Sequence, residues 1–169
     1  MNPTAASFTI ALALAIVPPA MAQATQSHAH HPAAAASADV DVPAAATAAV
    51  AVAERFNTAL SSGDLATVES LLAANVLILE SGGAERSREE YMGHHAISDA
   101  AFLKDAHRQL LRQRARAAGE FAWVGTESEL HAQKDGEPLT VQSTETMVLK
   151  QTADGWRIVH IHWSSRTRR

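Results

Sequence analysis

Two histidines near the end of the chain have a spacing that could support chemistry. In WRIVHIHWSSR, residues 156–166, His160 and His162 lie two positions apart in an apolar run. On a β-strand such residues share a face, with backbone atoms about 6.5–7 Å apart. The pair is compatible with three roles: hydrogen bonds within the fold, contact with a polar ligand, or binding of one metal ion.

The metal interpretation needs further ligands, because zinc takes three protein ligands in a catalytic site and four in a structural one. Glu80, Glu145 and His94 are the candidates, and the sequence does not place them beside the pair. We therefore predict no metal site and no cofactor.

Glu80 is the candidate catalytic base. It ends the apolar run NVLILE, residues 75–80, just before Gly82-Gly83, where a carboxylate can lie at a pocket mouth and move a proton. His162, or His160, would be its proton donor. The alternative is a solvated strand end.

Further residues are predicted to bind a ligand with these histidines. We expect His160 and His162 to point into a cavity, because Val159, Ile161 and Trp163 on the opposite parity form a better apolar surface for subunit contact. The predicted ligand-binding set is Tyr91, His94, Trp123, Glu127, Glu145, His160 and His162.

Helical periodicity precedes strand patterns along the chain. Apolar residues recur at helical steps from Ala44, and Asp64 and Ser87 precede two more helical segments. The remainder predicts strands at about 108–118, 120–132, 138–151 and 156–165. This order predicts an α+β fold with helices packed on a curved antiparallel sheet.

The N-terminal region predicts export. Residues 1–22 are uncharged, with an apolar stretch and an Ala-Met-Ala end, as in a signal peptide. Residues 23–43 indicate a disordered tether, 44–165 the domain, and 166–169 a basic tail. We expect a secreted or periplasmic protein with no stable membrane span after cleavage; the alternative is that the segment is retained as an N-terminal anchor.

The composition limits the classes of binding partner that we expect. The net charge of −4 disfavours nucleic-acid binding, and the absence of cysteine excludes disulfides. Small organic molecules, other proteins and further copies of the chain remain. Arg108, Arg112, Arg114 and Arg116 share parity and indicate a solvated or intersubunit stripe.

Two segments resemble known families. PLTVQSTETMVLKQTADGWRIVHIHWSS, residues 138–165, resembles the association domain of calcium/calmodulin-dependent kinase II, and residues 55–83 resemble bacterial ketosteroid isomerases. Both belong to the nuclear transport factor 2-like (NTF2-like) superfamily, which includes SnoaL-like proteins. The resemblance implies a cone-shaped domain and a tendency to oligomerise.

Departures from both families limit what the resemblance implies. Glu80 stands where the isomerases have an aspartate base, but Phe56 replaces their oxyanion-hole tyrosine. Glu127 and Met147 replace basic residues of the association domain. We therefore expect an exported, non-catalytic domain that binds a small organic ligand or a protein partner and forms a homodimer or larger oligomer. The alternative is a cofactor-independent isomerase, cyclase or hydrolase with Glu80 as base.

Overall fold

The computed structural model describes residues 37–168. The predicted signal peptide, 1–22, and the predicted tether up to residue 36 lie outside the described residues. Within 37–168, no helix combines the length and the apolar character needed to cross a membrane.

The helices begin and end where local sequence signals predict. Gly63, with φ of 75°, ends the first long helix, and the Asp64 carboxylate accepts a hydrogen bond from the Thr67 amide at 3.0 Å to cap the next. Ser87 caps the third by accepting from the Glu90 amide. The helical elements are the 3₁₀ turn η1 (Ala44–Ala46), α1 (Thr47–Ser62), α2 (Leu65–Leu71), α3 (Arg88–Gly93) and α4 (His95–Leu103).

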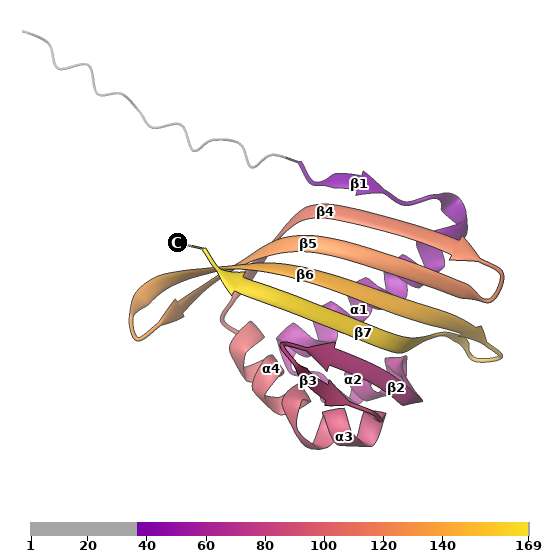
Figure 1. Cartoon of the computed structure of the whole chain (residues 1–169), viewed down its shortest axis with the longest axis horizontal. Coiled ribbons are helices and arrows are strands. Elements are labelled where there is room, and N and C mark those ends of the chain that lie inside the picture. Colours follow the sequence, from indigo (N-terminus) through magenta and orange to yellow (C-terminus); the bar gives the residue numbers. More distant parts are fainter. Residues whose placement is uncertain (1–36, 169) are drawn as a thin grey trace, which may run out of the picture. The chain divides into compact units, whose positions relative to one another are not determined.

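One curved, open sheet carries the helices on one side, as Figure 1 shows. Its strands are β1 (Asp39–Asp41), β2 (Leu72–Glu80), β3 (Gly83–Glu85), β4 (His107–Ala118), β5 (Phe121–Lys134), β6 (Glu137–Thr152) and β7 (Gly155–Thr167). Their order is β1-β4-β5-β6-β7-β2-β3. The predicted α+β class and the β4–β7 antiparallel meander are confirmed, but β1 and β2 pair in parallel with β4 and β7, so the sheet is mixed.

β-Bulges in β4 and β7 change which residues face the helices. The β6–β7 register shifts so that Leu149 pairs with Ile158 and Val148 with His160, which leaves Val159 as the extra residue. As a result Ile158 and Ile161 are both fully buried, although their parity differs. A similar shift at Leu111 separates the inward Arg108 from the outward arginines that follow it.

The domain extends beyond both predicted boundaries. Asp39–Asp41 pairs with β4, so the prediction of a disordered tether through residue 43 is wrong there. Ion pairs with the arginine stripe hold this segment against β4: Arg114 binds Asp39 at 2.6 Å and Arg116 binds Asp41 at 2.7 Å. At the other end β7 continues to Thr167, so the predicted start of the tail at residue 166 is also wrong.

Candidate functional site

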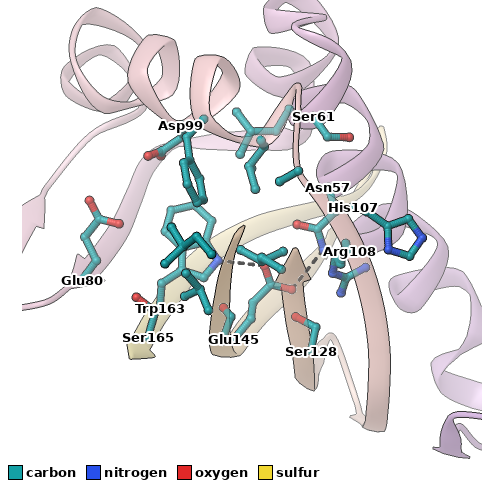
Figure 2. A pocket seen from close by; sticks show the side chains of 18 of the residues that line it. Asn57, Ser61, Glu80, Asp99, His107, Arg108, Ser128, Glu145, Trp163 and Ser165 are labelled. Carbon is teal, nitrogen blue, oxygen red and sulfur yellow. Dashed lines mark hydrogen bonds between the residues drawn. The ribbon is translucent and has the colours of Figure 1, made fainter. Parts of the chain in front are cut away.

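A cavity of about 900 Å³ is lined by residues of the helices and of the inward face of the sheet. This volume falls within the range usual for small-molecule sites. Figure 2 shows polar side chains converging there from α1, α4 and strands β4–β7. Its lining includes Asn57, Leu60, Glu80, Asp99, Phe102, Arg108, Leu130, Val141, Glu145 and Trp163. We call this space the main cavity.

Glu145 is a buried carboxyl group in the main cavity wall, with an exposed fraction of 9%. The Trp163 indole N–H donates to one carboxyl oxygen at 2.8 Å, and the Asn57 amide donates to the other at 3.1 Å. Burial raises the pKa of Glu145, and these two hydrogen bonds oppose the rise. Each oxygen keeps a lone pair that could accept a hydrogen bond from a ligand.

A second carboxyl group, Asp99, lies on the helical side of the main cavity. The Tyr91 hydroxyl donates to it at 3.0 Å. Burial and the charge of Glu80 raise the pKa of Asp99 to about 6, while the Tyr91 hydrogen bond and His95 lower it. Asp99 therefore changes protonation state near neutral pH.

Aromatic packing fixes the position of Trp163 between these groups. Its ring centroid lies 6.3 Å from that of Phe56 and 6.1 Å from that of Tyr91. Both neighbours are fully buried. Trp163 thus presents its N–H to Glu145 from a fixed position, which the stick view in Figure 2 makes visible.

An ion pair lies at another part of the lining. The Arg108 guanidinium contacts the Glu54 carboxylate at 3.3 Å, and the Gln113 side-chain amide donates to the same carboxylate. The Arg108 charge is therefore already balanced by a residue of α1.

Some predicted site residues reach the main cavity and others do not. Glu80 and Glu145 line it, and Tyr91 packs behind Trp163 and holds Asp99. His94 is exposed and does not line it. The prediction that His94 lines the pocket is therefore wrong.

Trp123 and Glu127 lie on the outward face of β5. Trp123 is 42% exposed, and Glu127 pairs with Arg112 at 3.1 Å. Neither lines the main cavity, so their predicted place in the cone pocket is wrong; Glu127 lines a separate, smaller hollow of about 280 Å³. Strict alternation along β5 places them opposite the inward Val124 and Ser128.

The predicted orientation of the histidine pair is also wrong. His160 donates from Nδ1 to the Leu77 carbonyl at 2.8 Å, and His162 is exposed. Trp163 lines the main cavity in their place. The physical reason is the bulge at Val159, which shifts the inward positions from even to odd numbers along β7.

Sequence reasoning missed Asn57 and Asp99. Asn57 continues the apolar series of Ala53, Phe56 and Leu60 at helical spacing, and a polar residue on such a face is a signal for a buried hydrogen bond. Asp99 similarly lies three residues after Ala96 and four before Leu103.

Comparisons with known proteins identify the family and the fold of this chain. The family model described as SnoaL-like domain matches residues 49–167. A putative ketosteroid isomerase from Shewanella frigidimarina is 35% identical, with a TM-score of 0.67 over 75% of this chain and 100% of that one. No curated protein matches the sequence.

Two more distant structures share the fold. The calcium/calmodulin-dependent kinase II hub of S. rosetta is 21% identical, with a TM-score of 0.64 over 75% of this chain and 99% of the hub. An NTF2-like protein with a cystatin-like fold from Novosphingobium aromaticivorans is 16% identical, with a TM-score of 0.59 over 69% of this chain and 78% of that one. The predicted NTF2-like fold is confirmed.

Proposed function

Because this chain belongs to the SnoaL-like domain family, we propose that its main cavity binds a small organic ligand, with Glu145 as the polar anchor. The observation that carries the proposal is the fixed carboxyl group at the cavity wall. Asn57 and Trp163 orient both oxygens of Glu145 while leaving acceptor capacity toward the cavity.

The lining defines the chemical class of the ligand. Leu60, Leu130 and Val141 offer apolar contact, whereas Glu145 and Asp99 disfavour an anionic group beside them. The lining also holds the cations Arg108, Lys134 and Arg166. The charge of Arg108 acts on Glu145, and Glu54 already pairs with Arg108. The fitting ligand has an apolar or aromatic body and carries a hydroxyl or amino donor.

The binding test compares matched pairs of compounds. Aromatic alcohols and amines are titrated beside analogues in which methyl replaces the donor, with Trp163 fluorescence in a Trp123→Phe, Trp156→Phe background as the readout. We expect Glu145→Gln to weaken binding of the donor compounds at least about tenfold, the scale of one hydrogen bond to a charged group. It should leave the methyl analogues unchanged.

His162→Asn is the control, because His162 lies on the outward face. The proposal fails if no donor compound binds at millimolar concentration, or if Glu145→Gln and His162→Asn have equal effects.

A second candidate function is proton transfer in a small isomerase. Two observations favour it: the pKa of Asp99 is raised to about 6, and the 35%-identical structure is a putative ketosteroid isomerase. A carboxyl group that titrates near neutral pH is suited to act as a general base. Asp99 suits this role better than the predicted base Glu80, which lies 3.7 Å from His95 as an ion-pair partner.

The enzyme test follows exchange of α-protons for deuterium in cyclic ketones by NMR. We expect Asp99→Asn to abolish exchange and Glu80→Gln to reduce it less. Exchange that is unaffected by Asp99→Asn would reject this candidate, and the absence of exchange with wild-type protein would favour simple binding.

The outward face of the sheet is the proposed surface for self-association. A cross-strand row runs Trp123–Val148–His160–Leu77, and Trp123 and Leu77 are 42% and 38% exposed. The structural likeness to a kinase hub supports oligomerisation. Light scattering at micromolar concentration should give a dimer or larger mass, and Trp123→Glu should reduce it to the monomer mass. A monomeric wild-type protein would contradict the proposal.

Export is the remaining part of the proposed function. It is supported by the uncharged apolar segment at residues 1–22. Fractionation of the native host, with N-terminal sequencing, should recover a mature chain that begins at Gln23 outside the cytoplasm. Recovery of the uncleaved chain in the cytoplasm would contradict it.

A further inference from the structure

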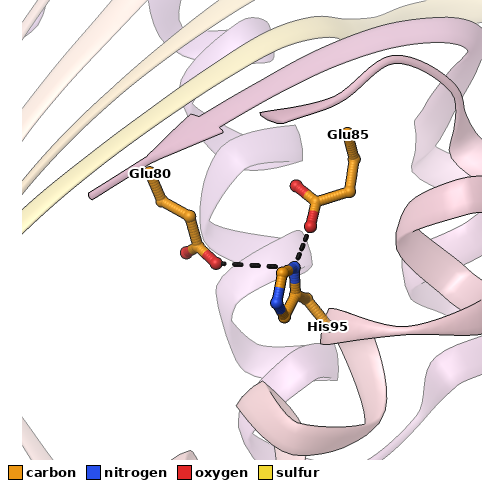
Figure 3. Close-up of side chains that lie close together, drawn as sticks. All are labelled: Glu80, Glu85 and His95. Atoms are coloured by element: carbon orange, nitrogen blue, oxygen red, sulfur yellow. Dashed lines mark hydrogen bonds and ion pairs between the residues drawn. The ribbon is translucent and has the colours of Figure 1, made fainter. Parts of the chain in front are cut away.

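We propose that Glu80, Glu85 and His95 form a binding site for a first-row divalent transition-metal ion such as Zn²⁺. The three side chains converge at the end of the β2–β3 hairpin in Figure 3. Among residues 37–168 they are the group of three whose carboxylate and imidazole ligand atoms all lie within 4.8 Å of one another. The proposal goes beyond ligand binding in the main cavity.

The fold places the two carboxylates on one face of the hairpin. Glu80 pairs with Gly83 and Ile78 with Glu85, so Glu80 and Glu85 are diagonal neighbours on the same side. Ser81 and Gly82 form the connection with φ of 44° and 89°, as a two-residue hairpin turn of type I′ requires. A short hairpin with a defined turn holds the two side chains in register.

His95 completes the group from a different element. It is the first residue of α4, and the Ser87-capped helix α3 positions it. Its Nδ1 contacts Glu85 Oε1 and lies 3.7 Å from Glu80 Oε1. Ligand atoms around a metal at about 2.0–2.2 Å lie about 3–3.5 Å from each other, so small side-chain movements would admit an ion.

The unusual feature of the group is the burial of Glu85. Its side chain is 4% exposed, and its Oε2 atom is buried with no hydrogen-bond partner. A buried carboxylate oxygen without a partner is costly. Within residues 37–168, no lysine or arginine forms an ion pair with Glu80 or Glu85, so one imidazole faces two carboxylates. A divalent cation would supply the missing charge and the missing partner.

The donor set indicates the class of metal. Two carboxylate oxygens and one imidazole nitrogen suit Zn²⁺, Mn²⁺, Fe²⁺ or Co²⁺, whereas Ca²⁺ prefers six to eight oxygen ligands. Three protein ligands leave a coordination position for water or another small molecule. Because Glu80 also lines the main cavity, the ion would lie at its border.

The test is titration of the full chain with Zn²⁺ against a chromophoric chelator, and with Co²⁺ by visible absorption. The starting protein carries His28, His30 and His31 changed to Asn, which removes the N-terminal histidine cluster as a competing site. We expect one tight Zn²⁺ equivalent, no comparable binding of Ca²⁺, and a Co²⁺ spectrum with d–d bands.

Variants then assign the ligands. Glu85→Gln and His95→Asn should each weaken Zn²⁺ binding at least about 100-fold, since loss of even an outer partner of a metal ligand costs 10–100-fold. His94→Asn is the matched control: it removes the neighbouring histidine, which is outside the group, and should leave affinity unchanged.

Thermal melting keeps the test decisive if a variant is less stable. Zn²⁺ should raise the melting temperature of the starting protein and of His94→Asn, but not that of Glu85→Gln. The proposal is overturned by the absence of a tight equivalent, by retained affinity in Glu85→Gln, or by equal losses in His94→Asn and His95→Asn. None of these outcomes depends on an organic ligand, so failure here is distinct from failure of the main-cavity proposal.

Discussion

Glu145 and Glu85 are both buried glutamates, with exposed fractions of 9% and 3%, but their carboxyl oxygens have different hydrogen-bond partners. Neutral donors, an indole N–H and an amide, satisfy both oxygens of Glu145. Glu85 has a titratable imidazole on one oxygen and nothing on the other. Neutral donors orient a carboxyl group without balancing its charge, whereas an unfilled oxygen beside a second carboxylate leaves a need for a cation.

The largest expected effect is the difference in stability lost when each of these two glutamate side chains is removed. Glu145→Ala leaves the Trp163 N–H and the Asn57 amide without their acceptor, so it should lower the free energy of unfolding by about 2–3 kcal/mol. Glu85→Ala in chelator removes a poorly compensated buried charge, so the loss should be below about 1 kcal/mol. Chemical denaturation at pH 7 measures both losses, and equal losses would contradict the proposed difference between the two carboxyl groups.

Asp99 provides an intermediate case, with one neutral donor and partial burial. Its folded-state pKa of about 6 exceeds the ordinary value of 3.8. The folded chain therefore holds a proton that the unfolded chain lacks between these values, so the Asp99 contribution to stability is lost as pH rises from about 4 to 6. Asp99→Asn should stabilise the protein by about 1 kcal/mol at pH 8, after allowance for partial solvent screening, and by nothing at pH 4.

This second prediction is measured by denaturation across pH in chelator, with Asp154→Asn in an exposed turn as the control. A gain that does not depend on pH would show that the amide stabilises by packing and that the Asp99 carboxyl group is not perturbed.

The smallest expected effects compare two histidines on the outward face of β7, one with a hydrogen-bond partner and one exposed. His160→Ala loses the hydrogen bond to the Leu77 carbonyl and should cost about 1 kcal/mol. His162→Ala should change stability by less than about 0.5 kcal/mol, as usual for an exposed position. Neither should change ligand affinity in the main cavity, and a loss of affinity in His162→Ala would contradict the assignment of the faces.

The order of elements could be predicted from the sequence because its signals are local. Apolar spacing at 3.6 residues, the caps Asp64 and Ser87, and glycine turns all act within a few residues. These signals predicted four strands of the meander and most of the helices. The parallel pairings at both ends depend on contacts between distant segments, which local patterns do not encode.

The candidate site was less predictable because a single inserted residue reverses strand parity. The bulge at Val159 exchanged Trp163 and the histidines between faces, and the bulge at Leu111 separated Arg108 from Arg112. Nothing in the residue types at these points marks a bulge. Glu85 was missed because β3 has only three residues, too few for an alternation to be recognised.

One overlooked long-range signal was present in the sequence. Asp39 and Asp41 repeat at the same two-residue interval as Arg112, Arg114 and Arg116. Complementary charges at matching strand spacing can indicate pairing, and here they do.

The strand β1 also covers the middle of an exposed sheet edge. Without it, β4 would be an edge of twelve residues with unpaired backbone donors and acceptors, a template on which another chain can add. With it, Arg112–Arg114 in the middle of that edge are paired, and the outermost strands, β1 and β3, are each three residues long. A chain shortened to begin at residue 44 would keep every lining residue of the main cavity, yet it would leave the whole of β4 open and should aggregate edge to edge more readily.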